Sequence, residues 1–265
     1  MFELDLLALP DDIFKDIETP KVVQRNISNL STLTTTEELM FLNPFSDNNI
    51  LKPSWSKNDF APGQVWAVYY GNDLMPRVYT QVNNTVSGSQ VCVTLLESLP
   101  TLDHEIHWKK ENLPIVNGIF KVSGTSVNIE MSKFSHLVPC RQSVCKSFYK
   151  IYPLKGEIWA MYKKWNIEWK QPDHNSYQCQ IVEILSGSEG DGITVARLGE
   201  VKGCLTFFHR QQCDGFDLTH AVSRVETLSF SHRIPAFRVP GIGKYGIPES
   251  SWHLEPKALI PIRKY

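Results

Sequence analysis

The stretch Gly63-Gln64-Val65-Trp66-Ala67-Val68-Tyr69 recurs as Gly156-Glu157-Ile158-Trp159-Ala160-Met161-Tyr162. A second stretch, Phe134-Ser135-His136, recurs as Phe230-Ser231-His232. In both copies the motifs stand in the same order, 70 positions from Trp66 to His136 and 73 from Trp159 to His232. Such self-similarity marks a duplicated unit. We therefore expect two related halves, and any function must be sought in both halves and in the seam between them.

From residue 59 onward the chain consists of short segments that alternate apolar and polar residues between turn signals, which is typical of antiparallel strands. These segments predict a mainly β fold of two small barrels of the SH3-like or Tudor-like kind, packed as one body. The first repeat is assigned to 59–140 and the second to 141–265. The expected strands are Gln64–Tyr70, Val78–Val82, Val91–Leu96 and Gly118–Val122, then Glu157–Tyr162, Tyr177–Leu185, Ile193–Leu198 and Gly203–Phe208.

One segment could be mistaken for a phosphate-binding loop, the glycine-rich run Gly187–Gly192. It lacks the lysine and the following helix that such a loop needs. A hairpin turn ending in Asp191-Gly192 is the better interpretation.

The first 58 residues are polar and are predicted to form a partly flexible arm with short helices. Two helix starts are indicated, one where Asp11-Asp12 precedes Ile13-Phe14. The other is where Thr34–Glu38 forms a capping-box pattern ahead of Leu39–Leu42.

Composition excludes several classes of function. The chain of 265 residues has 42% hydrophobic and 21% charged residues, as in ordinary globular proteins. A net charge of −1 gives no overall attraction for nucleic acid or for an anionic membrane. The acidic start Met1–Asp5 does not resemble a signal peptide, and no apolar run is long enough to span a membrane. We expect a protein of the nucleus or cytoplasm whose six cysteines are reduced.

The repeated Ser-His pairs are the first candidates for chemistry. Neighbours on an extended strand point to opposite faces, so the serine and histidine of one pair are not expected to meet as a nucleophile and its base. A structural role is therefore favoured for the repeated motifs, whose central residues are Trp66, Trp159, Phe134, His136, Phe230 and His232.

Metal ligands and paired acids are also weakly indicated. Cys140 and Cys145 form one loose pair near His136, and His104 and His107 stand alone, whereas zinc sites usually combine two tight clusters. Capping and solvation explain the acidic residues, which show no acid–base spacing. We expect no metal and no cofactor.

Aromatic residues are the strongest binding candidates. Trp165 and Trp169 follow the second Trp-Ala-x-Tyr strand in a lysine-rich turn, and rings that converge at a barrel mouth can hold a methylated ammonium group or a peptide. Arg77 could pair with a carboxylate or a backbone carbonyl. The expected binding residues are Trp165, Trp169, Tyr162 and Tyr177 in the second half, and Tyr69, Tyr70, Arg77 and Tyr79 in the first.

Several blocks in order resemble one family, the uncharacterised domain that lies C-terminal to the J domain in many plant DnaJ-type proteins. The blocks are Gly63–Tyr69, Met75–Tyr79, Tyr152–Tyr162, Trp165–Trp169, Phe230–Pro235 and Trp252–Pro261, so the resemblance covers about residues 59–261. Asp73-Leu74 replaces the usual Asp-Gly, and Glu255 and Lys257 depart from the closing block. The chain has no His-Pro-Asp tripeptide, so the resemblance does not carry chaperone stimulation. It implies a plant protein with a binding role tied to transcription or chromatin, and it supplies no catalytic residues.

The leading functional hypothesis is a non-enzymatic module that binds a protein or peptide partner, such as a histone tail or a transcription-associated protein. A docking domain for clients or partners of J-domain co-chaperones is the second. An enzyme would need His136, His232 and Cys145 to meet at the seam. Single-stranded nucleic acid along the basic and aromatic stretch Tyr149–Lys170 is the least favoured.

Overall fold

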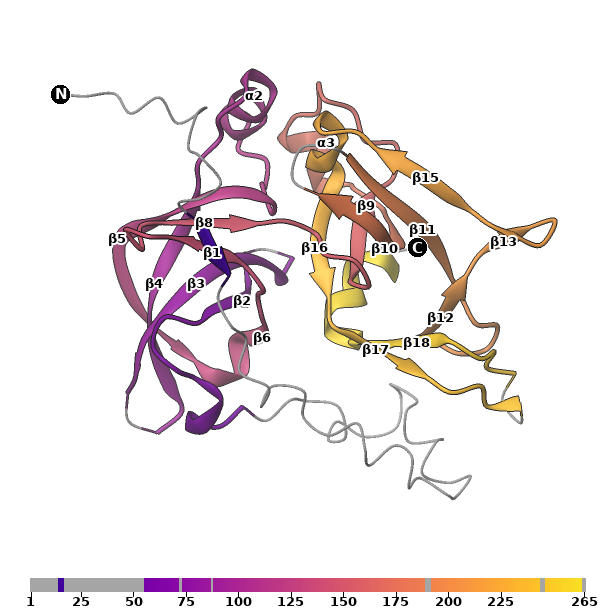
Figure 1. Cartoon of the computed structure of the whole chain (residues 1–265), viewed down its shortest axis with the longest axis horizontal. Coiled ribbons are helices and arrows are strands. Elements are labelled where there is room, and N and C mark those ends of the chain that lie inside the picture. Colours follow the sequence, from indigo (N-terminus) through magenta and orange to yellow (C-terminus); the bar gives the residue numbers. More distant parts are fainter. Residues whose placement is uncertain are drawn as a thin grey trace.

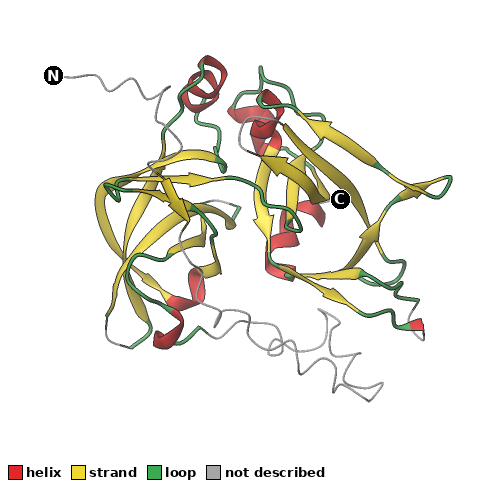
Figure 2. Cartoon of the chain, in the orientation of Figure 1, coloured by secondary structure: helices red, strands yellow, loops and turns green. Residues whose placement is uncertain are grey.

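Two large antiparallel sheets make up most of the molecule and lie side by side in Figure 1. The computed structural model describes residues 14–16, 55–71, 73–86, 88–188, 192–243 and 246–263. Figure 2 shows that strands dominate both halves, with short helices between them. The prediction of a mainly β chain built from two antiparallel units is confirmed.

The first sheet runs in the order β1-β7-β8-β5-β4-β3-β2-β6 and curls around a core (Figure 1). Strand β2, which begins the repeated unit, pairs with β3 on one side and with β6 on the other. Strand β6 carries Phe134-Ser135-His136. The bounds are β1 (Phe14–Asp16), β2 (Val65–Tyr70), β3 (Met75–Thr85), β4 (Gln90–Ser98), β5 (Gly118–Glu130), β6 (Phe134–Leu137), β7 (Arg141–Ser143) and β8 (Phe148–Ile151).

The second sheet runs in the order β16-β9-β10-β11-β12-β18-β17, and β15 also pairs with β11. The β10–β11 hairpin closes where Ser188 faces Gly192, so the predicted hairpin is confirmed. The bounds are β9 (Ile158–Tyr162), β10 (Cys179–Ser188), β11 (Gly192–Glu200), β12 (Phe207–Arg210), β15 (Thr219–Val222), β16 (Phe230–Ile234), β17 (Ala236–Val239) and β18 (Ser251–Leu254). A small hairpin joins β13 (Gln212–Cys213) to β14 (Phe216–Asp217).

The duplication extends further than the two motifs. The long strand β5 pairs with β4, the third strand of the first repeat. In the second repeat, β12 and β15 pair with different parts of the third strand, β11, so together they match β5. A 3-10 helix precedes the Phe-Ser-His strand in each half, η6 (Met131–Lys133) before β6 and η7 (Val225–Ser229) before β16. The hairpin β7–β8 is matched by β17–β18. The first sheet therefore extends beyond residue 140, to Ile151.

Insertions distinguish the two repeats, and two of them contain a helix. Between β4 and β5 the first repeat inserts α2 (Asp103–Lys110), where the second has a short connection. Between β9 and β10 the second repeat inserts α3 (Gln171–Asn175), where the first has a tight turn. The insertions pack on each other, because Trp108 of α2 lies in the core of the second repeat and Gln171 donates a hydrogen bond to the Asn112 carbonyl.

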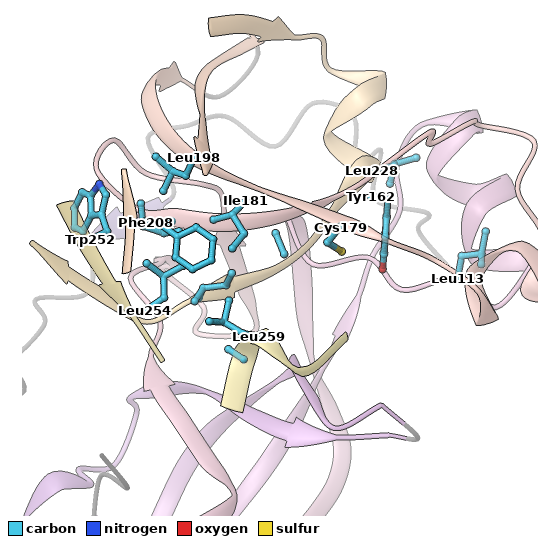
Figure 3. Packing of buried hydrophobic residues seen from close by; sticks show 14 of the residues in the cluster. Leu113, Tyr162, Cys179, Ile181, Leu198, Phe208, Leu228, Trp252, Leu254 and Leu259 are labelled. Carbon is cyan, nitrogen blue, oxygen red and sulfur yellow. The ribbon is translucent and has the colours of Figure 1, made fainter. Parts of the chain in front are cut away.

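Apolar side chains fill both repeats. Trp66 and Trp159 are fully buried at the centre of equivalent clusters, each edge-to-face with the phenylalanine of the second motif. Figure 3 shows the largest cluster, in which Leu113 of the first repeat lies on the same side as Tyr162 and Leu228 of the second. The two halves therefore share apolar core.

Most of the N-terminal arm, including the helix expected after Thr34–Glu38, lies outside the described residues. The prediction of a helix after Asp11-Asp12 is wrong, because Phe14–Asp16 forms strand β1 and pairs with the edge of β7. Pairing with that edge gives these backbone groups partners that three residues of helix would not provide. The last described element is the 3-10 helix η9 (Pro256–Arg263).

Candidate functional site

The Ser-His pairs lie in β-bulges, and the expectation that their side chains cannot meet is wrong. In β16 the register jumps from Phe230 to His232, and in β6 it shifts at the equivalent place. A bulge sets two residues against one on the partner strand, which suspends the strict alternation of side chains. The hydroxyl of Ser231 consequently lies 2.9 Å from Nδ1 of His232, and Ser135 lies 2.9 Å from Nδ1 of His136.

The bulges explain why the two motifs recur together. The tyrosine of each Trp-Ala-x-Tyr motif lies beside the bulge serine, Tyr69 by Ser135 and Tyr162 by Ser231. At the other end of the motif, the Trp66 indole donates to the Gln64 carboxamide and the Trp159 indole to the Glu157 carboxylate, each at 3.0 Å. Each motif residue thus has a packing or hydrogen-bonding partner inside its own repeat.

Arg77 of β3 is the most connected side chain at the seam between repeats. Its Nε donates to the Ser231 backbone carbonyl at 3.1 Å, and one Nη donates to the Ser231 hydroxyl at 2.9 Å. The His232 Nε2 lies 2.9 Å from the Ala258 carbonyl and must donate to it. Nδ1 therefore accepts from Ser231, which completes a chain of hydrogen bonds from Arg77 to the C-terminal helix η9.

Asp73 and Tyr177 complete this cluster. Asp73 forms an ion pair with Arg77 and accepts a hydrogen bond from the Tyr177 hydroxyl at 2.8 Å. Burial alone would raise the Asp73 pKa, but Arg77 and Tyr177 outweigh it and hold the pKa below its ordinary value. The Arg77 guanidinium also lies 5.1 Å from the centre of the Tyr177 ring. The Arg77 guanidinium thus occupies the face of Tyr177 where a ligand cation would otherwise bind.

Both histidines of the bulges are buried and neutral. Burial, reinforced by Arg77, lowers the pKa of His232 to about 3, and burial with Arg233 and His232 nearby lowers the pKa of His136 well below its ordinary value. Cys145, the third residue of the hypothetical enzyme site, lies exposed in the β7–β8 hairpin, 3.2 Å from the Ser143 hydroxyl. The geometry therefore brings the serines and histidines together but keeps them away from solvent.

The four aromatic residues predicted in the second repeat do cluster. Tyr162 lies 5.2 Å from Tyr177 and 5.5 Å from Trp169, measured between ring centres. Trp165 and Trp169 both contact Trp108, at 5.9 and 6.4 Å, and remain half-buried. Among the described residues, the Trp165 Nε1 is a buried donor with no hydrogen-bond partner.

The aromatic residues predicted in the first repeat separate into two environments. Tyr79 is 2% exposed and donates to the Val116 carbonyl at 2.7 Å, so it belongs to the core. Tyr70 is 65% exposed, and with Tyr69 it lines a cavity of about 210 Å³ at the open end of the first barrel. The remaining lining is apolar apart from Asn128 and Lys133 and consists of Val68, Val78, Leu95, Val127 and Ile129.

Sequence reasoning missed three members of the seam cluster, namely Trp108, His174 and Asp73. His174 lies 3.1 Å from the Tyr162 hydroxyl and stacks on Tyr177. Trp108 and His174 belong to the insertions, which have no counterpart in the other repeat. The four-residue spacing of Asp73 and Arg77 was visible, but their pairing depends on the tight turn before β3.

Within the described part of the chain, no group of three or more histidine, cysteine or acidic side chains is placed to hold a metal ion. The helices described there are all too short or too polar to cross a bilayer.

The geometry defines a mainly β protein with an internally paired seam and an apolar cavity at the mouth of the first barrel. Residues 42–242 match the family described as Domain of unknown function (DUF3444), and the chain belongs to this family. Neither the curated proteins nor the solved structures contain a significant match.

Proposed function

We propose that this protein is a non-enzymatic module that binds a protein partner by taking an apolar side chain of that partner into the mouth of the first barrel. The observation that supports this is the cavity of about 210 Å³ lined by Tyr69, Tyr70 and five aliphatic residues. It is smaller than the roughly 300–1,000 Å³ typical of small-molecule sites, so its size suits one side chain. An apolar pocket with an exposed tyrosine at its rim is the usual form of an interface anchor.

The second repeat lacks an equivalent lining, which favours a single site. Val68 faces Val78 across β2 and β3, whereas its counterpart Met161 faces Gln180 across β9 and β10. Val127 faces Val93 in the first repeat, and the corresponding pair in the second is His220 with Val195. Lys133 at the rim of the first-barrel cavity would favour a partner with an acidic residue beside its apolar anchor.

Selection of peptides from a random displayed library against the full chain tests this function. Selected peptides should bind about tenfold more weakly to Tyr70→Ala, as expected for loss of an interface anchor. Phe216→Ala is the matched control, because Phe216 is 78% exposed on the distant β13–β14 hairpin. Binding that is unaffected by both Tyr70→Ala and Lys133→Glu would refute the barrel-mouth site.

A second candidate is a reader of methylated lysine tails that uses Trp165 and Trp169. The half-buried faces of both indoles favour it. A methylated histone-peptide array with the Trp165→Ala/Trp169→Ala variant decides between the sites. Selective binding that this variant loses would support the reader, and binding lost in Tyr70→Ala would support the barrel mouth.

We further propose a setting in the plant nucleus or cytoplasm and a relation to DnaJ-type proteins, both of which rest on the resemblance of the sequence blocks. Under the docking-domain alternative, the full chain should bind a J-domain protein directly. Titration of the purified chain with such a protein measures this. Binding of unfolded chains without preference would instead indicate a client-docking role.

A further inference from the structure

Strands β7 and β17 occupy equivalent positions in the two repeats. Phe120 faces Tyr149 in the first repeat, and Phe208 faces Trp252 in the second, so β8 corresponds to β18. On the next strand, Gln142 faces Tyr149 and donates to its hydroxyl. At the same position in the second repeat, Arg238 faces Trp252 with its guanidinium 4.4 Å from the indole centre. The outer edges of β7 and β17 are therefore the same edge of the duplicated unit.

Only one of these edges is covered in the described structure. The chain's own segment Phe14–Asp16 forms β1 and pairs antiparallel with β7, with Asp16 opposite Arg141 and their side chains 3.6 Å apart. Strand β17 ends the second sheet, and within the described ranges no strand pairs with its outer side. A row of unpaired backbone donors and acceptors at such an edge is a template for strand addition.

The chemistry of the β17 edge specifies what could add to it. Arg238 is 45% exposed and contacts the Glu183 carboxylate at 2.7 Å, but Glu183 also holds Arg210 through two bonds of 2.9 Å. Arg210 also pairs with Asp217 at 2.9 Å, so two carboxylates balance the two guanidinium groups. Arg238 holds Glu183 through a single bond, and its exposed part can still meet a further acid. The flanking residues Phe237 and Val239 point to the other face, where the Phe237 ring lies tilted against His253 with ring centres 5.0 Å apart.

We propose that the outer edge of β17 binds an extended segment of a partner protein with the pattern apolar–acidic–apolar, which adds an antiparallel strand to the second sheet. The acidic residue lies opposite Arg238, and its apolar neighbours lie opposite Phe237 and Val239. Phe14–Asp16 of a second copy is a poor occupant, because in the β1–β7 register Lys15 would lie opposite Arg238 and two like charges would face each other. This surface is independent of the barrel mouth.

The test uses the full chain and a capped peptide of sequence Ser-Val-Glu-Val-Thr, with a twin that has lysine in place of glutamate. Hydrogen exchange of the Ala236–Val239 amides should slow when the glutamate peptide is added, because their outward groups gain partners. The lysine twin should bind about fivefold more weakly, the effect of one cross-strand charge pair. Arg238→Glu should reverse this preference.

Arg238→Gln is the second variant, since it keeps the length and polarity of the side chain without its charge. It should retain binding of both peptides and lose the discrimination between them. Amide exchange at Arg141–Ser143, whose edge β1 covers, should not change, and Tyr70→Ala should leave peptide binding unaltered. Absence of slowing at Ala236–Val239, or slowing that is equal for the two peptides, would overturn the proposal.

Discussion

Ser231 and Ser135 occupy the same bulge in the two repeats, but their partners differ. Both serines contact the tyrosine and histidine of their own repeat. Ser231 also accepts a hydrogen bond from Arg77 of the other repeat. Removing either hydroxyl leaves a buried histidine Nδ1 without its hydrogen-bond partner. At Ser231 the same change also leaves an Arg77 N–H donor without its acceptor. The pair therefore gives an internal comparison in which the local motif is held constant.

We predict that Ser231→Ala lowers the free energy of unfolding by about 2 kcal/mol, and that Ser135→Ala lowers it by about 1 kcal/mol, in keeping with the cost of unsatisfied buried groups. Chemical denaturation of both variants measures the difference. Equal losses, or a larger loss at Ser135, would mean that the Arg77 contact adds nothing to stability.

Stability should fall in mild acid because of the buried histidines. Burial, with Arg77 nearby, lowers the pKa of His232 to about 3 and that of His174 to about 4, and burial alone lowers that of His253 to about 4. Above pH 6.5 both folded and unfolded chains hold these groups neutral. Between pH 6.5 and about 3 the unfolded chain binds the additional protons, so the free energy of unfolding decreases as the pH falls.

Denaturant midpoints measured from pH 7.5 to 4 check this dependence. His232→Gln removes one of the titrating groups, so its stability should depend less steeply on pH than that of the unmodified chain. A free energy of unfolding that stays constant or rises down to pH 4 would contradict the assignment of neutral buried histidines.

At the scale of elements, each repeat begins with a glycine in the left-handed region. Gly63 has φ +88° and Gly156 has φ +86°, and at both positions a methyl group would meet no atom within 4 Å. Gly63→Ala and Gly156→Ala should therefore each cost about 1 kcal/mol from backbone strain alone. Gly124→Ala, which has open space and no positive φ, is the matched control and should not destabilise β5. Thermal or denaturant unfolding of the three variants decides.

Arg77 connects elements of the two repeats, and its loss should be felt across the seam. We expect Arg77→Ala to lower the free energy of unfolding by about 3 kcal/mol, because Asp73 and Ser231 lose a mostly buried partner. Arg141→Ala, which breaks the more exposed pair with Asp16, should cost less than about 1 kcal/mol. Denaturation curves compare them, and similar losses for both variants would refute the seam role of Arg77.

Much of the element order could be predicted from the sequence, since apolar alternation is a local signal. The Trp-Ala-x-Tyr strands and the hairpin at Gly192 were of this kind. The bulges at Ser135 and Ser231 could not be predicted, because a register shift depends on which strand lies alongside. Strand β1 has only three residues, too few for any periodicity, and its formation depends on the edge of β7.

The candidate site was predictable in part for the same reason. The aromatic residues of the second repeat were identified from their composition and spacing, and they do contact one another. Their internal partner Arg77 comes from the other repeat, and the cavity at Tyr70 combines residues of β2, β3, β4, β5 and η6. Such long-range combinations are set by the sheet topology rather than by any local pattern.

At the scale of the whole molecule, the halves should unfold together. Besides Arg77, the seam is crossed by Asn117, which donates to the Thr227 carbonyl at 2.9 Å, and by Arg233, which donates to the Leu137 carbonyl at 3.2 Å. Trp108 adds a buried indole to the second core. Calorimetry of the full chain should show one transition with equal calorimetric and van't Hoff enthalpies. In Arg77→Ala/Trp108→Ala the transition should broaden or split, and two transitions in the unmodified chain would disprove the shared core.

The meeting of the two insertions also has an optical consequence. Trp108 and Trp169 come from different repeats, yet their ring planes differ by only 19° at a centre-to-centre distance of 6.4 Å. Indoles held this close and nearly parallel couple their electronic transitions, and this coupling gives a circular-dichroism signal that isolated indoles lack. The contribution of this pair should be lost when the repeats separate, whereas that of Trp55 and Trp66, whose ring centres lie 4.9 Å apart within the first repeat, should remain.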